Sequence, residues 1–143
     1  MKSKQHRMRI VVDTNIVISR IINKSGTAGR AFDLVFSELT PLASSETIAE
    51  VSAKLSHEKF FKYSTESERA DIISIICERS ELVDIESNVT ASPDPTDNKF
   101  LALAVDGRAD YIVSGDKKHL LFLKSYEGIP ILSPAAFLAA IEH

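Results

Sequence analysis

The sequence predicts a three-layer α/β/α sandwich with a central, mainly parallel sheet of about five strands. Short runs rich in β-branched residues alternate along the chain with segments of helical periodicity. Parallel strands joined by helices bury both faces of their sheet, which requires a helical layer on each side. The 143 residues contain no internal repeat, low-complexity segment or linker, so they predict a single domain.

The expected strands are short. RIVVD at 9–13 is the clearest, a β-branched run that ends in an acid. Pro41 weakens the second strand, because proline cannot donate a hydrogen bond to a sheet. The strands are expected at residues 9–13, 39–44, 81–85, 109–115 and 129–133.

Capping residues mark where several helices begin. Ser44 or Ser45 caps the third helix, and Pro134 begins the last one. Thr65 with Glu68 resembles a capping box before the long fourth helix. The helices are expected at residues 16–22, 28–38, 45–55, 65–80, 96–105, 117–123 and from 134 onward.

The composition is that of an ordinary soluble protein. It is 44% hydrophobic and 26% charged, with a net charge of −3 and no apolar stretch long enough to span a bilayer. The basic start lacks the apolar region of a secretory signal, so we assign residues 1–7 to a tail and 8–143 to the domain. The single cysteine, Cys77, excludes an internal disulfide, fits a reducing cytoplasmic location and is expected to pack in the core.

Three aspartates map to one edge of the predicted sheet. Asp13 ends the first strand, Asp116 follows the fourth, and Asp97 begins the helix that leads into the fourth. Ligands of open α/β sheets collect at this carboxyl edge, near the point where the strand order reverses. A structural interpretation stays open, since Asp13 suits a turn and Asp116 suits a helix cap. Asp97 shares a helical stripe with core-facing residues, which favours function, whereas Asp94 is the better cap.

Carboxylates gathered in one place resist ionisation unless a cation neutralises them. Two unit charges about 4 Å apart repel by roughly 4 kcal/mol at an effective dielectric near 20. The chain has no cysteine and histidine cluster of the zinc type, and oxygen ligands suit a hard cation, Mg²⁺ or Mn²⁺. Such an ion activates water and clamps a phosphoryl oxygen, so the pattern indicates metal-assisted phosphodiester hydrolysis.

Four segments carry a family resemblance: VVDTN (11–15), SSETIAEVSAKL (44–55), DPTDNKFLALA (94–104) and ADYIVSGDKKHL (109–120). In this order and spacing they resemble the PIN-domain ribonucleases, the family that includes VapC-type toxins of bacterial toxin–antitoxin modules. The resemblance runs from Met8 to Ser133. It implies a parallel sheet between helices and divalent-metal-dependent endonucleolytic cleavage of RNA, so we expect a ribonuclease toxin.

The resemblance also implies the residues of the site. Asp13, Asp97 and Asp116 would hold one or two Mg²⁺ or Mn²⁺ ions. Glu50 would complete the acid cluster and orient the attacking water; Glu46 fits the helical spacing about as well, but the match to the family favours Glu50. The residues expected to assist the acids are Asp94, Thr14, Asn15 and Ser114, the last where many relatives have threonine.

Basic and aromatic residues near this edge are candidates for contact with RNA. Lysines at helix ends are commonly just solvated, and aromatic residues suit base stacking, core burial or a homodimer contact. The resemblance implies a cognate antitoxin as a partner, and we expect a homodimer with no membrane association. The RNA contacts are expected at Lys54, Lys117 and Lys118, with Lys59, Lys62, His119, Phe60, Phe61 and Tyr63 as further candidates.

Three other functions fit parts of the pattern. A phospho-acceptor signalling domain requires a lysine after the fifth strand, which IPILSP lacks. A phosphatase of the haloacid-dehalogenase type requires a second acid two residues beyond Asp13, where Asn15 stands. A non-catalytic PIN-like module that binds protein or RNA stays open as the alternative, and a broken set of acids would mark it.

Overall fold

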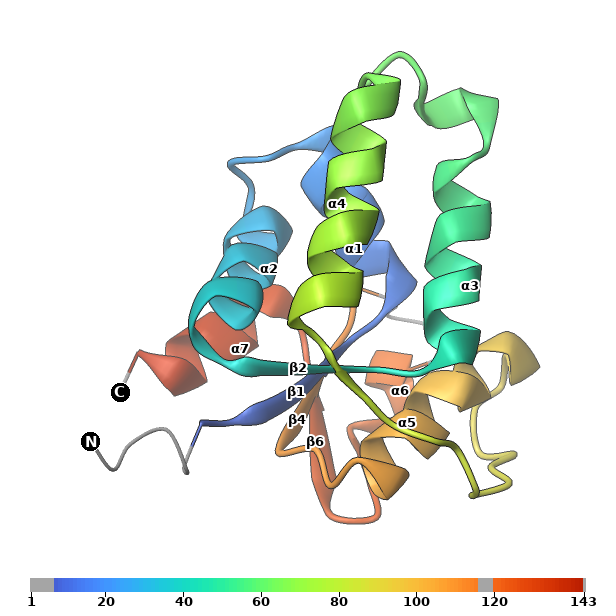
Figure 1. Cartoon of the computed structure of the whole chain (residues 1–143). Coiled ribbons are helices and arrows are strands. Elements are labelled where there is room, and N and C mark those ends of the chain that lie inside the picture. Colours follow the sequence, from blue (N-terminus) through green and yellow to red (C-terminus); the bar gives the residue numbers. More distant parts are fainter. Residues whose placement is uncertain (1–6, 116–119, 143) are drawn as a thin grey trace.

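The computed structural model describes residues 7–115 and 120–142 of the chain. Its strands are β1 Arg9–Val12, β2 Thr40–Ala43, β3 Glu81–Leu82, β4 Tyr111–Val113, β5 Ser125–Tyr126 and β6 Ile129–Leu132. They form one six-stranded sheet in the order β3-β2-β1-β4-β6-β5. Figure 1 labels its central strands, β2, β1, β4 and β6. Neighbouring strands are parallel except for β5 and β6. The predicted mainly parallel sheet is confirmed.

Local capping explains where the helices begin. The Ser44 hydroxyl accepts from the Thr47 N–H ahead of the third helix, and Thr65 and Glu68 form the predicted capping box ahead of the fourth. Pro134 opens the last helix, as expected. The helices are α1 Thr14–Ile22, α2 Thr27–Glu38, α3 Ser45–Leu55, α4 Glu66–Arg79, α5 Asn98–Asp106, α6 Leu120–Leu123 and α7 Pro134–Ile141, with 3₁₀ turns η2 Glu58–Phe60 and η3 Pro95–Asp97.

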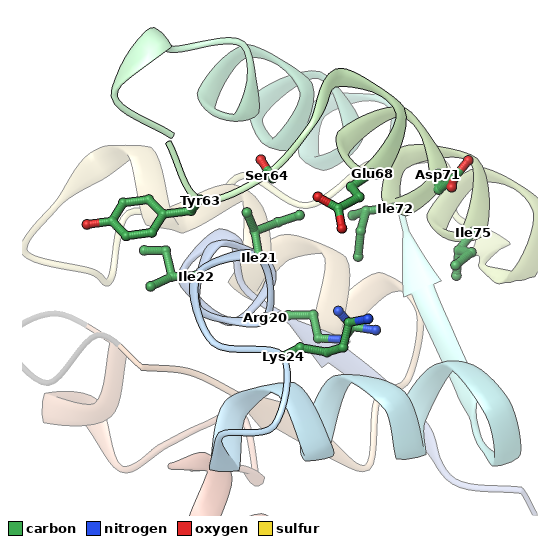
Figure 2. Close-up of a pocket in the computed structure, with 10 residues that line it drawn as sticks. All are labelled: Arg20, Ile21, Ile22, Lys24, Tyr63, Ser64, Glu68, Asp71, Ile72 and Ile75. Carbon is green, nitrogen blue, oxygen red and sulfur yellow. The ribbon is translucent and has the colours of Figure 1, made fainter. Parts of the chain in front are cut away.

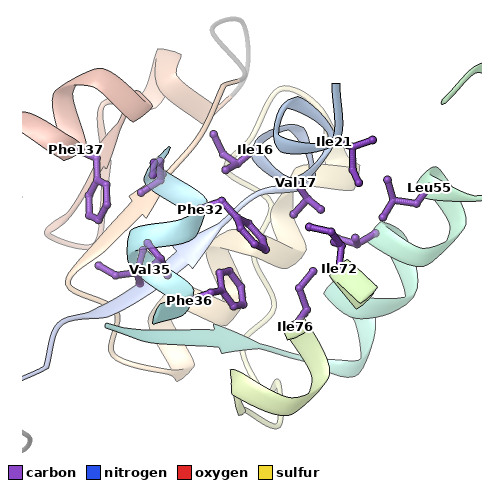
Figure 3. Packing of buried hydrophobic residues seen from close by; sticks show 14 of the residues in the cluster. Ile16, Val17, Ile21, Phe32, Val35, Phe36, Leu55, Ile72, Ile76 and Phe137 are labelled. Atoms are coloured by element: carbon purple, nitrogen blue, oxygen red, sulfur yellow. The ribbon is translucent and has the colours of Figure 1, made fainter. Parts of the chain in front are cut away.

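The sheet separates two hydrophobic cores because side chains alternate between its faces. Ile10 and Val113 point into the core formed with α1, α2, α3, α4 and α7. Their neighbours Val11 and Ile112 point into the second core, which α5 and α6 cover. In the first core the rings of Phe32 and Phe36 stack with centroids 4.3 Å apart (Figure 3). Helices therefore cover both faces, and the three-layer α/β/α class is confirmed.

Two local expectations were wrong. The chain forms an additional strand, β5, which pairs with β6 through a tight turn at Glu127 and Gly128, whose φ angles are +51° and +79°. Cys77 was expected in the core but is exposed. Helical geometry explains this, because Ile72 and Ile76 occupy the buried face of α4 and the next residue is rotated away from it.

Some predicted positions lie outside the described residues. These are the first part of the tail, residues 1–6, and Asp116, Lys117, Lys118 and His119 between β4 and α6. Within residues 7–115 and 120–142, every helix is too short or too polar to cross a bilayer.

Candidate active site

One polar hollow lies at the carboxyl edge of the sheet and has a volume of about 250 Å³. It lies beside the point where the strand order reverses, since β2 and β4 flank β1 on opposite sides. The hollow thus gathers side chains from the end of β1, from α3 and from the segment that leads into α5. Its lining residues are Asp13, Thr14, Asn15, Glu50, Lys54, Asp94, Thr96 and Asp97.

Asp13 lines this hollow and is buried, with only 2% of the residue exposed. Its Oδ1 accepts from the Ile16 N–H at 3.1 Å, which caps α1. The Ser114 hydroxyl, from the chain just after β4, donates to Oδ2 at 2.5 Å. The structural interpretation expected Asp13 to be a turn residue; in the structure it caps α1 and also lines the hollow.

Glu50 reaches the same hollow from α3. Thr14 Oγ1 donates to Glu50 Oε2 at 2.5 Å, and Lys99 Nζ lies 2.5 Å from Oε1. The competing candidate Glu46 does not line the hollow; its carboxylate accepts from the Ser45 hydroxyl at 3.2 Å instead. Of the two glutamates, geometry therefore brings Glu50 to the aspartates, as the family resemblance implied.

The segment before α5 places Asp94 and Asp97. Asp94 Oδ1 accepts from both the N–H and the hydroxyl of Thr96, at 3.0 and 2.8 Å, and so caps η3 as expected. Asn98 Oδ1 accepts from the Ser92 N–H at 2.8 Å and ties the loop to the first turn of α5. Asp97 ends η3 and stands at the start of α5, where it lines the hollow.

The lining of the hollow suits a hard cation by its chemistry. Apart from Lys54, every residue in it presents carboxylate, hydroxyl or amide oxygens, the ligands of Mg²⁺ and Mn²⁺. In residues 7–115 and 120–142, however, no three acidic, histidine or cysteine side chains converge closely enough to hold a metal ion. Two of the acids have other partners in the structure. Glu50 contacts Lys99 and Thr14, and Asp94 caps η3.

The structure describes three of the lysines that were predicted to contact RNA, and their surroundings differ from one another. Lys54 is exposed and lines the hollow. Lys59 and Lys62 each lie 5.2 Å from an aromatic ring centroid, on Phe60 and Tyr63 respectively. Phe60 is buried, whereas Tyr63 and the neighbouring Phe61 are exposed. Lys99 was not among the predicted site residues. The sequence offered a signal for it, because Lys99 follows Asp97 by two residues and lies one helical turn from Thr96.

A larger hollow of about 430 Å³ lies elsewhere, between α1 and α4. Figure 2 shows Tyr63 and Ile22 at one end of it, with Glu68 opposite Arg20 and Lys24. Its lining mixes isoleucines with charges of both signs and shares no residue with the carboxylate hollow. The smaller hollow, which Asp13, Glu50, Asp94 and Asp97 line, is therefore the candidate active site.

The fold and site together define an α/β domain that gathers acids over the switch point of a parallel sheet. A family model described as PIN domain matches residues 9–118, so the chain belongs to the PIN domain family. A curated relative, the uncharacterized protein MJ1680 of Methanocaldococcus jannaschii, is 30% identical over 118 residues, which span 81% of this chain and 76% of the relative.

Solved structures share the fold at lower identity. The VapBC2 complex of Rickettsia felis, bound to a DNA fragment from its promoter, contains a chain that matches with a TM-score of 0.59 and 16% identity over 88% of this chain and 98% of that one. DNA-bound VapBC of Salmonella typhimurium matches with a TM-score of 0.56 and 19% identity over 89% of this chain and 98% of that one. The predicted PIN-like fold is confirmed by these matches.

Proposed function

We propose that this PIN-domain protein is a Mg²⁺- or Mn²⁺-dependent endoribonuclease and the toxin component of a toxin–antitoxin module. PIN domains are generally nucleases. The observation that carries the proposal is the gathering of Asp13, Glu50 and Asp97 from separate elements into one oxygen-lined hollow at the carboxyl edge of the sheet. The sequence adds Asp116, the acid that follows β4.

The chain's own residues would fix the acids for this reaction. Asp13, Asp97 and Asp116 would hold the ion, which when bound would neutralise charge on the scissile phosphate and lower the pKa of water. The Ser114 hydroxyl and the Ile16 N–H hold the two oxygens of Asp13, so that carboxylate keeps one orientation. Asp94 is an accessory residue, because by capping η3 it fixes the turn that carries Asp97.

Glu50 would complete the acid cluster and orient the attacking water. Thr14 and Lys99 hold its carboxylate from two sides, which restricts its rotation. Lys54, exposed on the rim, would contact the RNA backbone, with Lys117 and Lys118 as further contacts from the sequence. Asn15, which is exposed in the lining, would bind water or RNA.

The proposal includes two protein partners, an antitoxin and a second copy of this chain. The likeness in fold to chains of VapBC complexes supports a cognate antitoxin. We also propose a homodimer in the cytoplasm. Mass measurement of the purified protein, from a chain of 15.8 kDa, tests the dimer directly. A neighbouring gene whose product binds this chain and suppresses its activity would support the antitoxin.

The activity is tested by incubating the protein with single-stranded and structured RNA, in Mn²⁺ and in EDTA. Cleavage in Mn²⁺ that EDTA stops and Asp13→Asn abolishes supports the enzyme. A matched control is Asp33→Asn, which removes a carboxylate on α2 that pairs with Arg20 on α1, outside the hollow, and should leave cleavage intact. Metal-independent RNA binding without cleavage would instead support the non-catalytic module, and cleavage of single-stranded DNA alone would contradict the ribonuclease.

A further inference from the structure

The hollow of about 430 Å³ between α1 and α4 has exposed apolar side chains at one end. Ile22, at the end of α1, and Tyr63, on the turn before α4, are 45% and 46% exposed. Figure 2 shows both at the same end of this α1–α4 hollow. Ile21, Ile72 and Ile75 add apolar surface to its lining. A protein partner that covered this surface would remove it from water.

A neighbouring hollow extends this surface across the end of α1. It has a volume of about 280 Å³, lies at the connection between α1 and α2, and shares Ile22 with the α1–α4 hollow. Apart from Ile22 its lining is uncharged and mostly small: Ser19, Asn23, Gly26, Thr27 and Ala28. The concave surface therefore continues from α4 over α1 to the start of α2, with an exposed isoleucine between its two parts.

Charges of opposite sign flank the α1–α4 hollow. Arg20 and Lys24 lie on the α1 side, and Glu68 and Asp71 lie on α4 (Figure 2). Arg20 already has an ion pair within the chain, and Glu68 belongs to the capping box of α4. Lys24 and Asp71 are exposed, and in the part of the chain that the structure describes neither has an ion-pair or hydrogen-bond partner. One cation and one carboxylate, on opposite walls, are thus available to a partner.

A second copy of the chain supplies both complementary charges at once. When two copies face each other about a two-fold axis along the hollow, the α1 wall of one lies over the α4 wall of the other. Lys24 of each copy then faces Asp71 of its partner, and the same ion pair is made twice. Ile22 and Tyr63 of the two copies meet at the same end. A partner that carries only negative charge, such as RNA, would be repelled by the α4 wall.

We propose that the α1–α4 hollow is the interface of a two-fold symmetric homodimer, in which Lys24 pairs with the partner's Asp71 and Tyr63 and Ile22 become buried. This inference rests on the homodimer of the proposed function and not on its ribonuclease activity. The α1–α4 hollow shares no lining residue with the carboxylate hollow. The contact between the two copies is therefore separate from the candidate active site.

The test measures the mass of the protein in solution over a range of concentrations at low salt, by light scattering and sedimentation equilibrium. The wild type should form a dimer of twice the 15.8 kDa chain mass. Lys24→Glu and Asp71→Lys should each raise the dissociation constant at least about tenfold, because each places like charges opposite one another at two symmetric positions. The double variant Lys24→Glu/Asp71→Lys should restore the dimer, because it exchanges the two charges.

A mixture of the two single variants gives a sharper test. Lys24→Glu and Asp71→Lys, combined in equal amounts, should form a mixed dimer with wild-type affinity, because opposite charges then face each other at both symmetric positions. Tyr63→Ala should weaken the dimer while the circular dichroism spectrum stays unchanged. Asp84→Lys is the matched control. It reverses an exposed carboxylate outside both hollows and should dimerise like the wild type.

The outcomes separate this interface from the rest of the proposed function. A dimer that both charge variants retain, or a mixture that stays monomeric, would refute this interface alone. A wild type that is monomeric at every concentration would refute the homodimer and its interface, while RNA cleavage still decides on the ribonuclease. If one charge variant does not fold, the other variant and Tyr63→Ala still decide.

Discussion

Asp13 combines two tasks in one side chain. One carboxylate oxygen caps α1, and the other accepts from the hydroxyl of Ser114 across the junction of β1 and β4. Ser114 is fully buried, so its hydroxyl has no ready replacement by solvent. The orientation of the proposed metal ligand thus depends on a fully buried neighbour.

Ser114→Ala should therefore lower RNA cleavage and destabilise the protein by about 1 to 3 kcal/mol, because it removes a hydrogen bond to a buried carboxylate. Chemical denaturation and the cleavage assay measure the two effects. Ser114→Thr keeps the hydroxyl and is the matched control. Equal losses in both variants would indicate that packing, and not the hydroxyl, is responsible.

Asp97 should behave as an acid held for function rather than for stability. In EDTA, Asp97→Asn should leave the free energy of unfolding unchanged or raise it, because a negative charge is removed from a hollow that also contains Asp13 and Asp94. Asp94→Ala is the control and should destabilise, since Asp94 Oδ1 accepts two hydrogen bonds as the cap of η3. A loss of several kcal/mol in Asp97→Asn would favour a structural role.

For individual residues, the sequence predicted where the site residues lie in the fold better than it predicted which side chains they contact. Strand ends and helix starts were enough to bring Asp13 and Asp97 to one edge, and the family resemblance chose Glu50 over Glu46. The pairing of Glu50 with Lys99 joins residues 49 positions apart, on different helices. Such a contact depends on how α3 and α5 pack, which local patterns do not contain.

Among the elements, α5 and the loop before it determine where Asp97 lies. Asp106, at the end of α5, accepts from the Ser87 hydroxyl and from the N–H groups of Ser87 and Glu86. These bonds, that from the Ser87 hydroxyl foremost, lower the pKa of Asp106 below its usual value. The far end of α5 therefore secures the start of the loop whose other end carries Asp94.

The lowered pKa sets the sign of a pH effect. A carboxylate with a depressed folded-state pKa stabilises the fold above its unfolded pKa, about 3.9, and this stability is lost as pH falls through the folded pKa. Asp106→Asn should be less stable than the wild type by about 1 to 2 kcal/mol at pH 7, with a smaller difference below about pH 4. Denaturation curves across that range measure it.

The matched control for this pH effect is Asp84→Asn, which removes an exposed carboxylate two residues before Glu86. Its stability curve should follow the wild type. If the wild type and Asp106→Asn instead lose stability in parallel as pH falls, the hydrogen bonds of Asp106 do not stabilise the charged form.

Element prediction succeeded where capping chemistry was explicit. The Thr65–Glu68 box and Pro134 placed their helices to within a residue or two. The β5–β6 hairpin was missed because β5 is only two residues long and follows directly after the expected helix at 117–123. The turn at Glu127 and Gly128 joins β5 to β6. The glycine between the two short runs was the available signal.

At the scale of the whole molecule, the sheet order explains why residues distant in sequence form one site. The chain builds β1, β2 and β3 outward on one side and then returns to place β4 against the other side of β1. The N–H of Asp13 donates to the Val113 oxygen at 3.1 Å across this junction. The two strand ends therefore open onto the same hollow, as expected for an α/β fold of this type.

The proposed function requires this hollow to hold a divalent ion between Asp13, directly after β1, and Asp97, directly before α5. The most direct measurement is anomalous X-ray scattering from a crystal of the protein soaked in Mn²⁺. We predict a peak within coordinating distance of Asp13 and Asp97, absent from crystals of Asp13→Asn. Crystals in which Mn²⁺ binds only elsewhere, or in which lysine ammonium groups fill the hollow at saturating Mn²⁺, would refute this metal site.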